Sequence, residues 1–224
     1  MPVVSTTLAG VNVFQFSGAV TDAEIKTAWA GTISNGVYVL NRAIYLDDTA
    51  DISGVSGGML VDFGTQVLPA IILHDSGDRT KQIFNNFTFL QRTGLTVANR
   101  SLMVRGTNGT VLTAIGDNGL SQKGGGFVYG VFGVAPGGGD NRYLNELPFG
   151  SLEGVTIYSQ EFTEQELQVI AFKSTQLKGL TFEKAYGFPQ IGTATDNVNV
   201  TVYRSNQNTQ ATASNGLIPI RLFP

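Results

Sequence analysis

One recurring pattern constrains the fold of this chain more than any other feature. A glycine or polar residue interrupts the chain, and a short apolar–polar–apolar run follows, as at residues 86–89, 154–157, 179–182 and 199–202. Such alternation is typical of a strand with one buried face, and Gly and Asn commonly form the turns between strands. The last three of these runs begin 25 and 20 residues apart, within the range of about a dozen to about 25 residues expected for one coil of a parallel β-helix.

Most of the chain shows the same alternation between breaks rich in Gly, Asn and Asp. The expected strands cover residues 11–16, 36–46, 59–63, 69–74, 83–90, 101–105, 110–115, 127–132, 154–158, 179–182 and 198–203, with a further one within 217–223. So many short strands with little helix predict an all-β fold. We expect one domain over residues 1–224.

The first of two helix signals lies near the N-terminus. Thr21 and Glu24 form a capping box, in which each side chain satisfies the backbone N–H of the other residue. Ile25, Ala28 and Trp29 follow at helical spacing and form one apolar face. The pattern predicts a helix near 21–30, within an N-terminal cap near 1–35.

A second capping box begins at Thr163 and ends at Glu166. Leu167, Ile170 and Ala171 then share an apolar face at helical spacing. This pattern predicts a helix near 163–173. Helix is expected in these two places only.

Two architectures accommodate these strands. The spacing of the runs favours a right-handed parallel β-helix, in which each coil buries its inward residues against the coils above and below. The alternative is an antiparallel β-sandwich or jelly roll, whose strands also recur at short intervals. Two glycine-rich segments, 123–126 and 136–140, are expected to be loops, and the second belongs to a longer loop near 136–150.

Four runs, 38–46, 59–64, 83–89 and 177–182, resemble the rungs of right-handed β-helix proteins, namely the pectin-lyase-like group and phage tailspikes. This resemblance covers roughly residues 36–205. A competing resemblance covers the segments 153–158 and 162–167, which are similar to the closing strand and turn of laminin-G-like jelly rolls. The first resemblance implies a solenoid, and the second implies a carbohydrate-binding sandwich.

The composition resembles that of one class of particle proteins. The chain has no cysteine, and charged residues make up 14% of it, against roughly 25% in an average soluble domain. Together with the abundance of Asn, Thr and Gly, this composition resembles bacteriophage virion proteins. The resemblance implies a structural component of a phage tail, baseplate or spike, made in the host cytoplasm. Such a component assembles, as a homotrimer, with copies of itself and with other virion proteins.

Two other functions remain open at this stage. One is a tailspike module that binds or depolymerises surface polysaccharide, and the other is a laminin-G-like carbohydrate-binding domain. A surface groove with two close carboxylates would favour the depolymerising module, because glycosidases use such a pair. Bound calcium would favour the laminin-G-like domain.

Several classes of function are not expected. The net charge is −3 without a basic run, so nucleic-acid binding is not predicted. No apolar run approaches about 18 residues, so membrane insertion is not predicted. The first residues lack the basic and apolar regions of a signal peptide. Without cysteine the chain has neither disulfides nor a Cys-based metal site.

The sequence also predicts a protein that is not an enzyme, with no catalytic, cofactor-binding or metal-binding residues. Its single histidine, His74, precedes Asp75 and Ser76, and this order indicates the end of a strand and a turn rather than a catalytic triad. The acidic cluster at 47–51 is interpreted as turn chemistry, since its spacing matches no EF-hand loop. Asp62 lies between Val61 and Phe63, so alternation predicts that its side chain points out of the core.

The candidate partner-binding residues lie late in the chain. The tail alternates bulky apolar residues with prolines, which is an aggregation hazard unless another surface covers it. We therefore expect the tail to contact a neighbouring subunit, and we add one aromatic residue from a polar loop. These candidates are Leu217, Ile218, Ile220, Leu222, Phe223 and Tyr143.

Overall fold

The computed structural model describes most of the first 128 residues and shorter stretches beyond them. The described residues are 1–64, 69–90, 104–113, 119–128, 149–158, 171–172, 176–178, 180–183, 190–191, 198–204 and 207–213. Strands dominate these residues, which confirms the all-β prediction. The α-helix among them, α1 (Asp22–Trp29), is followed by a 3-10 turn, η1 (Ala30–Thr32).

The first sheet is parallel in its middle and antiparallel at both edges. Its strands, in spatial order, are β1 (Val3–Leu8), β2 (Val11–Phe16), β5 (Ala43–Leu46), β7 (Ile71–His74), β10 (Val104–Thr107) and β11 (Leu112–Thr113). The strands from β2 to β10 pair in parallel, whereas β1 and β11 pair with their neighbours in antiparallel orientation.

The second sheet is wholly parallel. It contains β8 (Ile83–Asn85), β12 (Leu120–Lys123), β14 (Phe149–Glu153) and β17 (Gln176–Lys178). A separate parallel pair joins β16 (Ala171–Phe172) to β19 (Gln190–Ile191).

The third sheet is the longest and runs the length of the molecule. Its strands are β3 (Ile33–Ser34), β4 (Val37–Val39), β6 (Leu60–Asp62), β9 (Thr88–Leu90), β13 (Gly126–Val128), β15 (Thr156–Tyr158), β18 (Leu180–Glu183), β20 (Val198–Arg204) and β21 (Gln207–Ala213). The strands from β4 to β20 pair in parallel, and an antiparallel hairpin closes each end.

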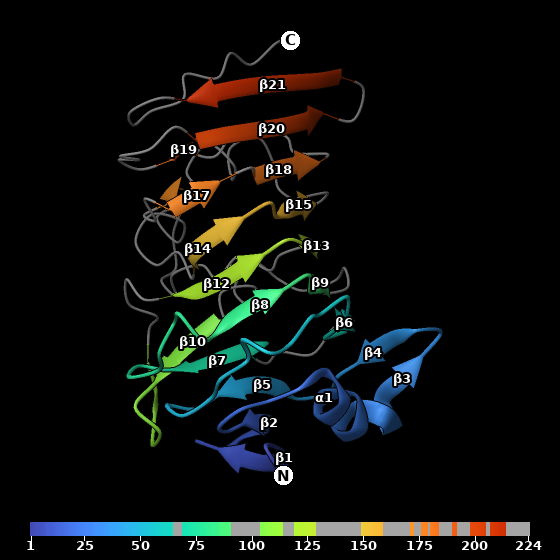
Figure 1. Cartoon of the computed structure of the whole chain (residues 1–224), viewed down its shortest axis with the longest axis vertical. Coiled ribbons are helices and arrows are strands. Elements are labelled where there is room, and N and C mark those ends of the chain that lie inside the picture. The colour runs from blue at the N-terminus through green and yellow to red at the C-terminus, as the bar shows by residue number, and fades with distance from the viewer. Residues whose placement is uncertain are drawn as a thin grey trace.

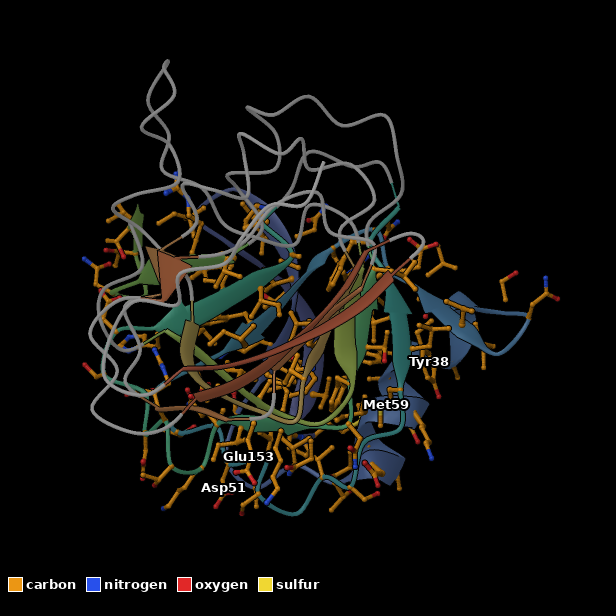
Figure 2. The ribbon with its side chains drawn as sticks, turned by 90° about the horizontal axis from the view of Figure 1, so that it is seen from above. Tyr38, Asp51, Met59 and Glu153 are labelled. Carbon is orange, nitrogen blue, oxygen red and sulfur yellow. The ribbon has the colours of Figure 1, made fainter. Side chains whose placement is uncertain are left out.

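The chain visits the three sheets in a repeated order. It passes through β7, β8 and β9, and then through β10, β12 and β13, with each strand paired to the corresponding strand of the previous pass. Figure 1 shows the resulting stack, with β1 and α1 at one end and β21 at the other. In the view along the stack, the strands surround an interior filled with side chains (Figure 2).

Two segments that were each predicted as one strand form two strands joined by a corner. The segment 36–46 divides into β4 and β5, and the segment 83–90 divides into β8 and β9. At the second corner Asn86 adopts a left-handed φ of 53°, which ends β8 and turns the chain into the next sheet. The strand predicted at 11–16 has the predicted bounds.

The predicted N-terminal helix is confirmed. Glu24 N–H donates to Thr21 Oγ1 at 3.4 Å, and Thr21 N–H donates to Glu24 Oε2 at 2.8 Å, so both halves of the capping box are present. The prediction for 163–173 is wrong at its end, because Ala171 and Phe172 form a strand that pairs with β19. The rest of that segment lies outside the described residues.

The segment 123–126 was predicted to be a loop, and that prediction is wrong at both ends. Lys123 ends β12 and Gly126 begins β13. Only Gly124 and Gly125 form the corner between them, with φ of +65° and +70°. Of the predicted loop near 136–150, residues 149 and 150 belong to β14, and the others lie outside the described residues.

The interior is aromatic at the α1 end and along the next coils. The ring of Trp29 lies 6.0 Å from those of Phe14 and Phe16 and 5.4 Å from that of Tyr38, measured between centroids. Burial of such rings is a major source of stability. Trp29 is completely buried, so it anchors α1 against the first sheet.

Asp62 differs from its prediction. Its residue is 3% exposed, and Oδ1 accepts the N–H of Gly64 at 2.6 Å. Alternation places neighbouring side chains on opposite faces only while the strand is regular, and Asp62 is the last residue of β6. Its carboxylate therefore caps the turn that begins at Phe63 instead of pointing into solvent.

The first sheet is apolar on both faces. Phe14 and Ile44 pair on the inner face, whereas Val13, Ala43 and Tyr45 form a buried cluster on the other. Parallel strands buried on both sides are expected to show this pattern. Burial, with the nearby charges of Asp47 and Asp48, raises the pKa of Tyr45 to about 12.

Candidate functional site

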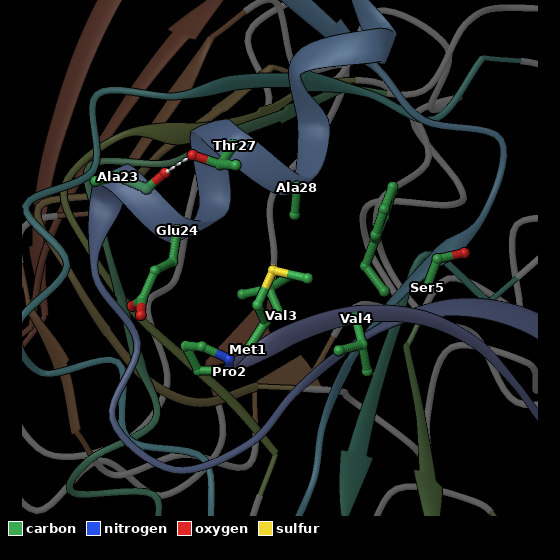
Figure 3. Close-up of a pocket in the computed structure, with 10 residues that line it drawn as sticks. Met1, Pro2, Val3, Val4, Ser5, Ala23, Glu24, Thr27 and Ala28 are labelled. Atoms are coloured by element: carbon green, nitrogen blue, oxygen red, sulfur yellow. Dashed lines mark hydrogen bonds between the residues drawn. The ribbon is translucent and has the colours of Figure 1, made fainter.

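A hollow of about 440 Å³ opens between β1 and α1 at one end of the stack (Figure 3). Most of its lining atoms belong to apolar or aliphatic groups. The lining residues are Met1, Pro2, Val3, Val4, Ser5, Phe14, Ala23, Glu24, Thr27 and Ala28. We call this hollow the end pocket.

The amphipathic sequence of α1 creates the end pocket. Ile25 and Trp29 lie on one face of the helix and are completely buried in the core. Ala23, Thr27 and Ala28 lie on another face and line the pocket. Small side chains at these positions leave room between the helix and β1. Thr27 Oγ1 donates to the carbonyl of Ala23 at 2.7 Å, so its hydroxyl is satisfied within the helix and its methyl group is available to line the pocket (Figure 3).

The strand β1 forms the other wall of the end pocket. Among the residues that the structure describes, it pairs with β2 alone, so one edge of the first sheet has no strand beside it. The sequence of β1, VVSTTL, contains no charged residue and no proline. Natural edge strands are usually protected by charge, proline or a covering segment. Val4, which lines the pocket, is 38% exposed.

Arg42 lies close to the same wall. Its guanidinium carbon is 5.0 Å from the ring centroid of Phe14, and Nη1 donates to the hydroxyl of Ser5. A cation above an aromatic ring is attracted by the negative face of the ring. This contact fixes the side chain of Arg42 beside β1.

A second hollow, also of about 440 Å³, follows the corners between the second and third sheets. It is polar, and its residues come in pairs from successive coils: Val55 and Ser56, Asn85 and Asn86, Lys123 and Gly124, and Glu153 and Gly154. We call it the corner groove. Asp22, the first residue of α1, ties the helix to this corner by accepting the N–H groups of Ser56 and Gly57 at 3.2 and 3.3 Å.

Backbone hydrogen bonds hold the coils together at this corner. Asn86 N–H donates to the carbonyl of Lys123 at 2.8 Å, and Gly124 N–H donates to that of Glu153 at 2.7 Å. The side chains of Lys123 and Glu153 approach to 3.6 Å, but they are 63% and 51% exposed. Such a surface pair contributes only about 0–1 kcal/mol. Glu153 is the one carboxylate among the lining residues, so the paired carboxylates of a depolymerising site are not brought together in this groove.

The acidic cluster at 47–51 forms turns. Asp47 accepts the N–H and hydroxyl of Thr49 at 2.9 and 2.8 Å and Nε2 of Gln15 at 2.9 Å, while Asp51 accepts the N–H and hydroxyl of Ser53. In the described part of the chain, no group of three or more His, Cys, Asp or Glu side chains is placed to hold a metal ion. His74 is the last residue of β7, and its Nδ1 accepts the N–H of Ser76 at 3.2 Å, as predicted for a strand end and turn.

The carboxylate of Asp47 should make the folding stability of the protein depend on pH. Burial alone would raise its pKa, but hydrogen bonds from Ser17, Gln15 and Thr49 outweigh burial and hold the pKa below its ordinary value. A lowered pKa contributes stability above the unfolded value of about 3.9, and that stability is lost as pH falls through the folded pKa. We expect Asp47→Asn to reduce the difference in unfolding free energy between pH 7 and pH 3.

Urea titrations of both proteins at the two pH values measure this difference. Asp48→Asn is the matched control, because it removes the same charge from an exposed neighbouring position. An unchanged pH dependence in Asp47→Asn would show that the hydrogen-bonded carboxylate does not couple to folding.

The predicted partner-binding residues, Tyr143 and those of the tail, lie outside the described residues. The end pocket was missed by the sequence analysis, although 21–30 was predicted as a helix and Val3 and Val4 are visibly apolar. The pocket could not be predicted because β1 was not predicted as a strand, since its Ser and Thr residues are typical of a loop. Its pairing with β2 depends on the tight turn at Ala9 and Gly10, both of which have positive φ.

Comparisons of the chain with protein-family models, with curated proteins and with solved structures found no match. In the described part of the chain, no helix is long and apolar enough to span a membrane. The functional interpretation therefore depends on the geometry of the three main sheets, the end pocket and the corner groove.

Proposed function

We propose that this chain is a structural subunit of a bacteriophage particle, associated with a tail, baseplate or spike, and that it acts by assembly and not by catalysis. We further infer that its three parallel ladders are the faces of a right-handed β-helix. The repeated order of sheets supports the solenoid, because the passes β7–β8–β9 and β10–β12–β13 each add one strand to all three sheets, and the later pairs β14–β15 and β17–β18 each add one strand to the second and third sheets. We assign the β-helix a right hand because connections between parallel strands of one sheet are almost always right-handed.

The edge of β1, which has no strand beside it among the described residues, carries the proposal of assembly. A row of backbone donors and acceptors without charge or proline is a template for pairing with another chain. The end pocket lies beside this edge and presents apolar surface, including the partly exposed Val4. A backbone edge next to an apolar hollow is suited to a protein partner, since hydrogen bonds give affinity and the hollow accepts side chains.

The assembly is tested by measuring the mass of the full chain under native conditions. We expect light scattering after size exclusion to give three times the mass of one chain, as the resemblance to tailspikes implies. Native mass spectrometry provides an independent count of chains. A single-chain mass at every protein concentration tested would overturn the proposal.

A further inference from the structure

We propose that residues 217–223 of one copy bind the end pocket of a second copy, adding a strand to the edge of β1. This inference rests on the proposed assembly and names its partner and its contact. The segment reads LIPIRLF, in which five of the seven residues are Leu, Ile or Phe. Its side chains therefore match the apolar lining of the end pocket.

The alternation of the tail fits an added edge strand. In an extended strand Ile218, Ile220 and Leu222 share one face, and that face can enter the apolar pocket. Pro219 and Arg221 have the opposite parity, so the charge of Arg221 stays outside the pocket. In one of the two directions that the added strand can run relative to β1, the missing N–H of Pro219 points away from β1, which is where an edge strand tolerates proline.

The same chain cannot supply this strand to its own pocket. The last described strand, β21, ends at Ala213, so only residues 214–216 connect it to the tail. Three residues span on the order of 10 Å. In the nine-stranded sheet, seven strand-to-strand steps separate β21 from β4, which is roughly 34 Å at about 4.8 Å a step. The elements β1 and α1, whose residues line the end pocket, lie at the β4 end of the stack (Figure 1).

The contact is therefore heterologous, because the tail of one copy meets the pocket of the next. A heterologous contact closes into a ring or continues as a filament, depending on the rotation between copies. A ring of three satisfies every tail and every pocket. It is also the arrangement that fits a homotrimer.

The test uses two full-length variants, each of which loses one half of the contact. Val4→Asp places a charge in the end pocket, and the double variant Ile220→Asp, Leu222→Asp places charges on the inward face of the tail. We expect each variant alone to have the mass of one chain. Their mixture should form a complex of two chains, because one intact tail and one intact pocket remain.

Two further variants guard against misfolding. Thr6→Lys adds a charge to an exposed position of β1, where it blocks pairing without touching the core, and should behave as Val4→Asp does. Ile33→Asp is the matched control, because Ile33 is 53% exposed but does not line the pocket, and it should leave the mass unchanged. Far-UV circular dichroism establishes that each variant is folded.

The outcomes separate the contact from the proposed function. If the unaltered chain assembles and the tail variant keeps the same mass, the tail is not the contact and this inference is wrong, although the proposed assembly stands. The same conclusion follows if folded Val4→Asp and Thr6→Lys both assemble normally, or if the two half-contact variants do not combine. A single-chain mass for the unaltered protein overturns the proposed function itself.

Discussion

Replacing Gly57 with alanine is expected to lower the free energy of unfolding by more than about 4 kcal/mol, beyond the usual range for single substitutions. A Cβ at Gly57 would lie 1.5 Å from the carbonyl oxygen of Asn85 and 2.6 Å from its carbon. Both atoms belong to the backbone of the next coil and cannot rotate away. The coils must therefore separate at this corner, which breaks hydrogen bonds in the ladder.

The adjacent glycine is a matched control. Gly58 has a φ of +72°, close to the +79° of Gly57, but a Cβ there would meet nothing within 4 Å. Gly58→Ala should cost about 1–2 kcal/mol, the ordinary penalty of a left-handed conformation. Urea denaturation followed by circular dichroism and by the fluorescence of the single tryptophan measures both. Equal costs at the two positions would mean that the approach of the coils is not what requires glycine.

The second large effect is expected at Phe87, where alanine should cost about 3–5 kcal/mol. Phe87 is completely buried, and its ring lies 5.1 Å from that of Phe84 and 5.5 Å from that of Phe89. Truncation removes one member of a packed aromatic stack and leaves a cavity that fixed strands on neighbouring coils cannot fill.

Two further variants serve as controls for this result: Phe87→Leu is the conservative substitution, and Val111→Ala is the surface control. Leucine retains part of the buried volume and should recover some of the lost stability. Val111 is 53% exposed, and its truncation should change stability by less than about 0.5 kcal/mol. If Phe87→Ala unfolds at the same urea concentration as Val111→Ala, the aromatic stack does not stabilise the coils as we argue.

Local signals in the sequence predicted the elements whose stability is local. The capping box at Thr21 and Glu24 lies within one turn of chain, and the apolar alternation of 11–16 is complete in six residues. The strands that were missed include β1, β12 and β21, which are rich in Ser, Thr and Gln. Their strand conformation depends on pairing with another strand, which is the next strand along the chain for β1 and β21 and a strand of another pass for β12. No alternation within the polar strand itself reports that pairing.

The sites show the same division. The turn at His74 could be predicted because Asp75, Ser76 and Gly77 have turn chemistry of their own. The corner groove could not, because it joins Ser56, Asn86 and Gly154 from separate coils. The buried position of Asp62 was also missed, since alternation gives no warning that a strand ends at the acid and that the next turn requires its oxygen.

The order of pairing has a consequence for how the protein forms as it is synthesised. The β1–β2 hairpin is a local pairing at the N-terminal end, and its two strands are joined by a turn of two residues. Later strands pair with strands that emerged from the ribosome before them, as β5 does with β2 and β7 with β5. In the proposed β-helix, growth of this kind needs one nucleus, after which each pass of the chain serves as the template for the next. The fold can therefore advance with the nascent chain.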